Sequence, residues 1–398
     1  MKKEKGEHTH SAHATRRSTL AGLCALKKHF EQDAKIVAGN TEIGIEMKLQ
    51  GKRWPVLVST AAVPGIASVV AGREGRCPFL GVSGGDGSGN AGEDEAKTTA
   101  GVWIGGAATL SEVRRTFAAL YSAGGDAASC TRALAAMDDM LSWFASRQIR
   151  NVAALAGNVA TASPISDMNP ALMAMGATLV LASSAAASDT GARDVSTRPV
   201  PIRDFFVGYR RTLLRPDEVI AAIFVPLATA TLAEGAEEAK SGAAASATVA
   251  AAAGDQGQQA KPAPLLVPTT AAGPTRLEFV RCYKQARRRD DDISIVTATF
   301  RAVLSAAPGD GAWRVEALST GFGGMAAVTC AAKQLEAAAT GGEFSEAAFL
   351  RPGLAALSKD FCLPDNVPGG ELLNSCVRRC VVDYAGGNIT THDATHTQ

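Results

Sequence analysis

Three low-complexity tracts divide this 398-residue chain into the separate stretches that can form a packed core. They cover residues 81–101, 182–198 and 227–274, and alanine, glycine, serine and acidic residues dominate each one. Segments of this composition bury too little apolar surface to offset the loss of backbone entropy, so we expect solvated loops. Such insertions are tolerated, because doubling the length of a loop costs only about 0.6 kcal/mol. The folded core must therefore come from the stretches between the tracts.

The longest tract marks the expected boundary between two folded parts. The chain length fits two or three domains at roughly 150 residues each. We expect a tail over 1–17, a first domain over 18–226, a linker over 227–274, a second domain over 275–385 and a tail over 386–398. The two shorter tracts are then insertions within the first domain.

Apolar periodicity between the tracts predicts helices and strands. The expected helices are one capped by Ser18 with Leu20, Leu23, Leu26 and Phe30 inward, one capped by Ser111, one over 134–144, one from Asn169-Pro170 to Gly176, and others after 326. The expected strands cover 35–38, 55–58, 177–182, 218–225, 277–283, 295–305 and 313–319. The first two strands suggest a βαβ-like opening and the last three an antiparallel sheet, so the predicted class is α+β.

Charge and residue usage exclude several classes of function. Forty Lys and Arg balance 39 Asp and Glu to a net charge of +1, which argues against binding to nucleic acid. No run of about 18 apolar residues predicts a membrane span, and the charged N-terminus lacks the apolar core of a secretory signal, so we expect an intracellular protein.

No histidine occurs between residues 30 and 391, which excludes Ser-His-Asp catalysis and His-ligated zinc there. The eight cysteines form no C-x-x-C motif, and only Cys376 and Cys380 could share one helix face. Thiols so placed in a reducing compartment act mostly as small hydrophobes. Chemistry in this chain must therefore come from a cofactor or from carboxylates and lysines.

Two segments of small residues could approach a ligand with their backbone. Gly39-Asn40-Thr41-Glu42 follows a predicted buried strand, and Gly and Asn tolerate the positive φ that an anion-binding nest needs. The segment 151–158 is similar, and Thr161, Ser163, Ser166 and Asp167 follow it with polar side chains. Neither segment matches a Rossmann or P-loop motif, and each alone is more often a plain turn. Together they would suit a ligand that carries a diphosphate.

The order of several segments resembles the flavin domain of xanthine dehydrogenases, in the molybdenum hydroxylase family. These segments are IVAGNTEIGIEMK (36–48), residues 143–179, FFVGYRRTLLRPDEVI (205–220), YKQARRRDDDISIV (283–296), GFGGMA (321–326) and LPDNVPGG (363–370). The resemblance covers about 20–226 and 275–385, and GNTEIGIEMK and RRRDDDI look like xanthine dehydrogenase more than the related aldehyde oxidases.

The resemblance implies a two-part FAD-binding domain of the vanillyl-alcohol-oxidase, or PCMH, type. A smaller α/β domain with a three-stranded antiparallel sheet and helices should follow it. In the family, FAD takes electrons from iron–sulfur clusters and passes them to NAD⁺ or oxygen. The expected partners are iron–sulfur and molybdenum-binding domains or subunits within a homodimeric enzyme of purine catabolism. The implied location is cytoplasmic, with peroxisomal as the alternative.

The resemblance also implies a set of FAD contacts in this chain. The matching positions are Ile36, Val37, Ala38, Gly39, Asn40, Thr41, Glu42, Ile43, Phe144, Ala154, Leu155, Ala156, Gly157, Asn158, Asp167, Ile220 and Lys284, to which the polar pattern adds Thr161. Phe144 would offer an aromatic face, Ile220 an apolar wall, and Lys284 a cation that favours reduced flavin. The run 287–292 is either a solvated loop or, as in the family, a loop that affects access of NAD.

This chain departs from the family at two positions and in extent. Where the family has S-x-G-G-N, Ala154 lacks a hydroxyl worth about 0.5–1.5 kcal/mol as a hydrogen bond. Ala156 would strain the loop if that position needs positive φ. No cysteine cluster for iron–sulfur centres and no long molybdenum-binding portion occur, so we expect a subunit or a fragment of a larger enzyme. The alternatives are an interaction protein that has lost FAD and a free-standing flavin reductase.

Overall fold

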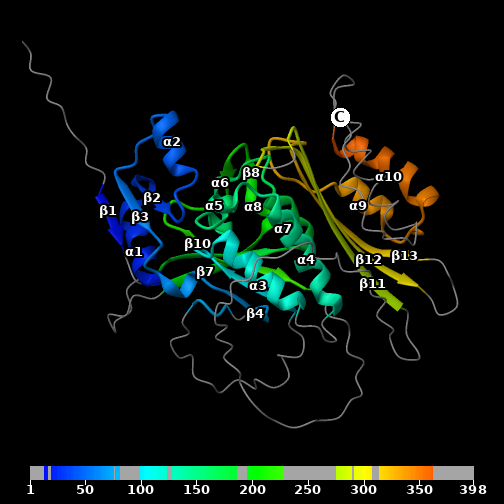
Figure 1. The fold of residues 1–398 in the computed structure, drawn as a ribbon, viewed down its shortest axis with the longest axis horizontal. Coiled ribbons are helices and arrows are strands. Elements are labelled where there is room, and N and C mark those ends of the chain that lie inside the picture. The colour runs from blue at the N-terminus through cyan, green and yellow to red at the C-terminus, as the bar shows by residue number, and fades with distance from the viewer. Residues whose placement is uncertain are drawn as a thin grey trace, which may run out of the picture.

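The computed structural model describes residues 13–16, 19–75, 77–80, 99–122, 128–185, 195–227, 275–288, 291–306 and 313–361. These residues form a mixture of helices and strands, as the α+β prediction requires (Figure 1). Most of the three tracts, the 363–370 run, Cys376 and Cys380 lie outside the described residues. Within the described ranges, no helix is long and apolar enough to cross a membrane.

The chain opens with the expected βαβ unit. β2 (Ala34–Val37) and β3 (Val56–Ser59) pair in parallel around α2 (Ile43–Leu49), and α1 (Leu20–Phe30) precedes them. β1 (His13–Arg16) adds a parallel strand beside β3, although this segment falls in the expected N-terminal tail. The Oγ1 atom of Thr19 caps α1 by accepting a hydrogen bond from Gly22 N at 3.1 Å, and Ser18 lies outside the described residues.

A five-stranded antiparallel sheet forms the centre of the first domain. Its order is β4 (Val69–Arg73), β5 (Ala100–Gly105), β10 (Val219–Pro226), β6 (Thr178–Ser184) and β7 (Val195–Pro201). Alternate residues of β5 and β10 face opposite ways. Ile104 and Ile223 pack against the helices that follow β5, whereas Trp103 and Phe224 pack against α1 and the N-terminal unit. Because both faces of this sheet are covered, β10 is buried along nearly its whole length.

Helices α3 (Leu110–Ser122), α4 (Ala128–Ser142), α5 (Arg147–Arg150), α6 (Leu155–Thr161) and α7 (Met168–Met175) connect β5 to β6. The helix predicted from Ser111 begins at Leu110, and the hydroxyl of Thr109 accepts from Glu112 N at 3.2 Å. The helix predicted to reach residue 144 ends two residues earlier, and α7 begins at Met168 rather than Asn169. Gly176 ends α7 in the left-handed conformation at φ 71°, as predicted.

The second domain is the predicted antiparallel sheet with helices on one face. β11 (Thr275–Ala286), β12 (Ser294–Ala306) and β13 (Arg314–Gly323) pair in chain order, and α9 (Lys333–Ala339) and α10 (Glu346–Asp360) cover one side. Phe300 and Phe322 meet there edge to face, with ring centroids 5.5 Å apart. The other face of the sheet lies against α4 and α7 (Figure 1). Within the first domain, α8 (Ile202–Phe205) follows β7 and leads into the hairpin of β8 (Phe206–Gly208) and β9 (Arg211–Thr212), which precedes β10.

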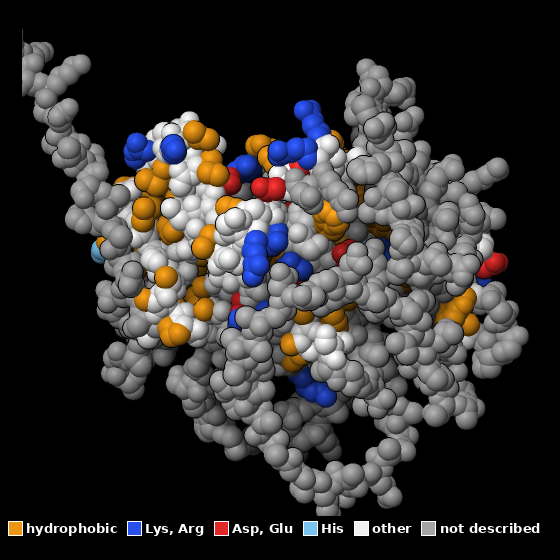
Figure 2. Space-filling model, in the orientation of Figure 1, with side chains coloured by type: hydrophobic (Ala, Val, Ile, Leu, Met, Phe, Trp, Pro, Cys, Tyr) orange, Lys and Arg blue, Asp and Glu red, His pale blue; other side chains and the backbone are white. Residues whose placement is uncertain are grey.

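Polar contacts and close backbone packing join the two domains. Arg203 of α8 binds both carboxylate oxygens of Glu336 in α9, at 2.8 and 3.0 Å. The N–H of Gly324 donates to the carbonyl of Pro164 at 2.8 Å. A Cβ atom on Gly321 would lie 2.1 Å from the carbonyl oxygen of Pro170, so β13 approaches α7 as only glycine allows. On the face in Figure 2, basic, acidic and apolar side chains lie interspersed over the described surface.

Replacing Gly321 with alanine should separate the two domains locally. The added methyl overlaps the Pro170 carbonyl, so we expect a loss of about 1–3 kcal/mol in the free energy of unfolding. Gly65→Ala is the matched control, because a Cβ atom there meets nothing within 4 Å. Denaturant unfolding of both variants measures the difference. An unchanged midpoint for Gly321→Ala would show that the strand can move away from α7 without loss.

Candidate functional site

The two segments of small residues lie against each other. Gly39 follows β2, and a Cβ atom on it would lie 1.9 Å from the carbonyl oxygen of Val152 and 2.8 Å from Ala153 N. Asn40 adopts the left-handed conformation at φ 57°, which its residue type tolerates. The backbones of 39–42 and 151–158 therefore meet, as a joint binding surface would require.

The second half of the 151–158 segment is helical rather than a loop. Ala154 occupies the N-cap position of α6 with extended backbone, and no side chain caps this helix. A serine at the N-cap would stabilise the helix by about 0.5–2 kcal/mol, so the hydroxyl that Ala154 lacks is a capping group. Ala156 lies inside α6 and is absent from the residues with positive φ, so the prediction of strain at this position is wrong.

The start of α6 presents backbone donors next to open space. Leu155 N donates to Ala108 O at 3.4 Å, whereas the structure describes no acceptor for the N–H groups of Ala156 and Gly157. Unpaired N–H groups are normal in the first turn of a helix, where the helix dipole is positive. A Cβ atom on Gly157 would meet nothing within 4 Å, so space remains beside this glycine.

Several polar side chains expected to bind a ligand instead bind the protein itself. Thr161 Oγ1 donates to Gly157 O at 2.9 Å, and Ser166 Oγ donates to Asn158 Oδ1 at 2.8 Å. Glu42 accepts from Arg210 Nη1 at 2.8 Å and thereby links the first segment to the turn between β8 and β9. These contacts assign Thr161, Asn158 and Glu42 to shaping the two segments.

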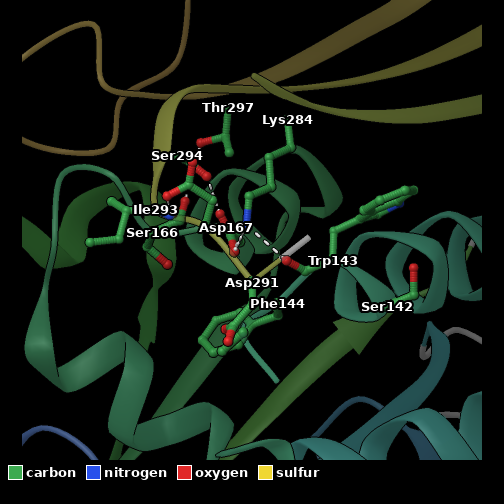
Figure 3. A network of polar contacts seen from close by, with 12 residues as sticks. Ser142, Trp143, Phe144, Ser166, Asp167, Lys284, Asp291, Ile293, Ser294 and Thr297 are labelled. Carbon is green, nitrogen blue, oxygen red and sulfur yellow. Dashed lines mark hydrogen bonds and ion pairs between the residues drawn. The ribbon is translucent and has the colours of Figure 1, made fainter. Parts of the chain in front are cut away.

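Asp167 and Lys284 form a buried ion pair across the two domains (Figure 3). Lys284 Nζ of β11 lies 2.8 Å from Asp167 Oδ2 at the start of α7 and 2.8 Å from Trp143 O. The hydroxyl of Ser294 in β12 donates to the other carboxylate oxygen of Asp167. Both charged side chains are only 10% exposed. Asp167 occupies the N-cap position of α7, yet its side chain makes no capping bond.

Burial raises the pKa of Asp167 above its usual value of 3.8, because desolvation disfavours the carboxylate. The ammonium of Lys284 and the hydroxyl of Ser294 act in the opposite direction and only partly offset this effect. The resemblance implied that Lys284 is a cation beside the flavin, and it named no partner for this charge. The structure instead shows a cation whose charge a buried carboxylate balances.

The remaining predicted positions contribute apolar surface or backbone. Phe144 follows α4, half-buried beside the Asp167–Lys284 pair (Figure 3). Ile220 lies in β10 next to a bulge and is 9% exposed. The other predicted positions, Ile36 and Val37 in β2, Ala38 after it, Thr41, and Ile43 at the start of α2, frame the first segment.

The loop after β11 is partly described. Arg288 N donates to Asp292 Oδ2 at 2.7 Å, and Asp291 has a positive φ of 49°. Residues 289 and 290 lie outside the described residues. Sequence reasoning missed Ser294 and Arg210, and no local pattern marks either residue, because their partners lie 127 and 168 positions away in the chain.

Lys284→Met should destabilise the protein in a pH-dependent way. A folded-state pKa above the unfolded value means that stability falls as pH rises from about 3.8 through that raised pKa. Removing Lys284 raises the pKa of Asp167 further and widens this window. We therefore expect a loss of about 3–5 kcal/mol near neutral pH and a clearly smaller one near pH 4.

Denaturant unfolding across this pH range measures the effect, with Lys28→Met as the control. Lys28 is exposed, and in the described part of the chain its ammonium donates to Ser184 O at 3.2 Å. If the loss for Lys284→Met were the same at every pH, the pairing with Asp167 would not be its cause.

Two family models match this chain. The FAD binding domain in molybdopterin dehydrogenase matches residues 93–228, and the CO dehydrogenase flavoprotein C-terminal domain matches residues 281–371. Solved structures share the fold. A Cu,Mo-CO dehydrogenase aligns with a TM-score of 0.60 at 17% identity over 95% of this chain and 98% of its own. Quinoline 2-oxidoreductase from Pseudomonas putida 86 aligns with 0.59 at 16% identity over 95% and 98%.

Curated relatives are similar in sequence along most of the chain. Xanthine dehydrogenase/oxidase of Gallus gallus is 31% identical over 89% of this chain, and nicotinate hydroxylase of Emericella nidulans is 35% identical over 68%. The chain spans only 19% and 16% of the length of these relatives. It therefore belongs to the molybdenum hydroxylases, as an oxidoreductase component that corresponds to the FAD-binding region of the xanthine dehydrogenase type.

Proposed function

We propose that the chain binds the diphosphate of FAD where the segment 39–42 contacts the start of α6. The observation that carries this proposal is the contact of Gly39 with the backbone of Val152, where a Cβ atom would fill the space. Backbone N–H groups of both segments are suited to a diphosphate, which carries negative charge. In this proposal, the parallel N-terminal sheet and the five-stranded sheet are the two parts of a PCMH-type domain.

The flavin end of the cofactor is proposed to lie at the seam between the domains. Phe144 and Ile220 supply apolar surface. The Asp167–Lys284 pair supplies polar groups, whose electrostatic interactions are stronger because the pair is buried away from water. FAD, when bound, supplies reversible transfer of electrons as one or two equivalents. The residues of this chain hold and orient it and set the charge around it.

We further propose that electrons reach FAD from iron–sulfur clusters and leave it to NAD⁺ or oxygen. Iron–sulfur and molybdenum-binding domains or subunits are then the partners, in a homodimeric enzyme of purine catabolism in the cytoplasm. What supports this proposal is the sequence similarity to relatives named xanthine dehydrogenase, of which this chain covers about a fifth.

The first test is FAD binding by the purified chain. Wild-type protein should take up FAD and show the visible flavin spectrum, and Gly39→Ala should weaken binding by about tenfold or more, because the methyl separates the two segments. Gly65→Ala serves again as the control. Titration by flavin fluorescence gives both affinities. If the wild-type protein is colourless and does not bind added FAD, the result would favour the alternative that the chain is an interaction protein that has lost the cofactor.

The second test concerns the ion pair. Lys284→Met leaves the carboxylate of Asp167 without its cation and should lower the flavin reduction potential, whereas Asp167→Asn leaves the cation and should raise it. We expect shifts on the order of 30 mV, which for two electrons is about 1.4 kcal/mol. Potentiometric titration of both variants decides the matter. Shifts of the same sign, or none, would place the pair away from the flavin.

A further inference from the structure

Three consecutive carbonyl groups follow α4, and each accepts a hydrogen bond from a cationic side chain. Trp143 O accepts from Lys284 Nζ at 2.8 Å, and Phe144 O accepts from Arg150 Nη1 at 2.8 Å. The same nitrogen of Arg150 also donates to Ala145 O. Cations are favourable here, because the C-terminal end of a helix carries partial negative charge.

The turn that Arg150 holds is a conformation that needs support. Ala145 has a positive φ of 43°, which is costly for a residue with a Cβ atom. The chain then re-enters a helix at once, with the Ser146 hydroxyl accepting from Ile149 N at 3.4 Å. The two carbonyl contacts of Arg150 span the strained residue and the one before it. They fix the backbone that carries the ring of Phe144.

The position of the Arg150 guanidinium is electrostatically unfavourable, because the group is partly buried and lies near two other arginines. Burial is the largest effect that lowers its pKa, and the nearby guanidinium groups of Arg114 and Arg147 lower it further, while Asp291 opposes them. Arginine remains protonated at any physiological pH, so the contact does not depend on pH. Arg114 has its own counterion, Asp138, at 2.7 Å.

We propose that Arg150 is a positioning residue that sets the orientation of the Phe144 ring toward the flavin. This inference rests on the proposed function, because that function assigns the ring to the cofactor. Among the described residues, the hydrogen bonds of the Arg150 side chain go to backbone carbonyls, so Arg150 is proposed to act through Phe144.

The test compares Arg150→Gln with Arg147→Gln in the full chain. Arg147 lies on the same short helix and is exposed, so its variant removes a charge without removing the carbonyl contacts. We expect Arg150→Gln to weaken FAD binding by about tenfold and to change the visible circular dichroism of the bound flavin. Arg147→Gln should leave both unchanged. Arg150→Lys should restore part of the affinity, because an ammonium can still donate to a carbonyl.

A double-mutant cycle with Phe144→Leu separates positioning from a general effect on stability. If Arg150 acts through the ring, Arg150→Gln should cause almost no additional loss of FAD affinity in the Phe144→Leu background. A full tenfold loss in that background, or an equal loss in Arg147→Gln, would overturn the proposal. Wild-type protein that binds no FAD would instead refute the proposed function and this inference with it, so the two failures are distinguishable.

Discussion

The packing of the two domains depends on polar contacts that the second domain makes with both ends of α7. At the N-terminal end, Asp167 is paired with Lys284, and at the C-terminal end Arg301 donates to Met175 O at 3.1 Å. Arg301 is itself paired with Glu278 at 2.6 Å. Both cations come from the antiparallel sheet, so its docking satisfies groups of the first domain that would otherwise be buried without partners. Removing either partner of such a pair is costly, which makes the arrangement specific.

These contacts with α7 also explain why glycines occur where β13 approaches the first domain. Gly321 and Gly323 lie where a Cβ atom would meet Pro170 O at 2.1 Å and Pro164 O at 3.0 Å. The sheet can therefore approach α7 closely enough for Lys284 and Ser294 to reach the same carboxylate. The proposed flavin site therefore forms only when the two domains pack together. The proposed diphosphate site, in contrast, consists of residues of the first domain.

Sequence patterns predicted the elements well and their caps poorly. The strands β11 to β13 follow from runs of apolar and β-branched residues, and Gly176 follows from its residue type. Ser111 was expected to cap one helix and Asn169 to begin another, but Thr109 caps α3 and Asp167 is the N-cap residue of α7. The N-cap is the residue just before the first helical residue, where the backbone N–H groups have no partner within the helix. When several polar residues lie close together in the sequence, their types do not show which of them occupies this position.

The candidate site was predictable only where residue type alone limits the backbone. Gly39 and Asn40 fit this description, because Gly39 allows close approach to Val152 and Asn40 has a positive φ of 57°. That they bind a diphosphate stays a prediction. The pairing of Asp167 with Lys284 depends on contacts between residues 117 positions apart, which no local pattern encodes. The strain expected at Ala156 was wrong, because a family pattern read as a loop is here the first turn of α6.

Hydrogen exchange with and without FAD tests most directly the claim that both domains contribute to one cofactor site. We expect FAD to slow exchange together in three separate regions, namely 36–43, 152–158 and the segment from Lys284 to Ser294. Distant surfaces such as α10 should remain unchanged. Protection confined to the first domain, with none around Lys284 and Ser294, would contradict a flavin site at the seam.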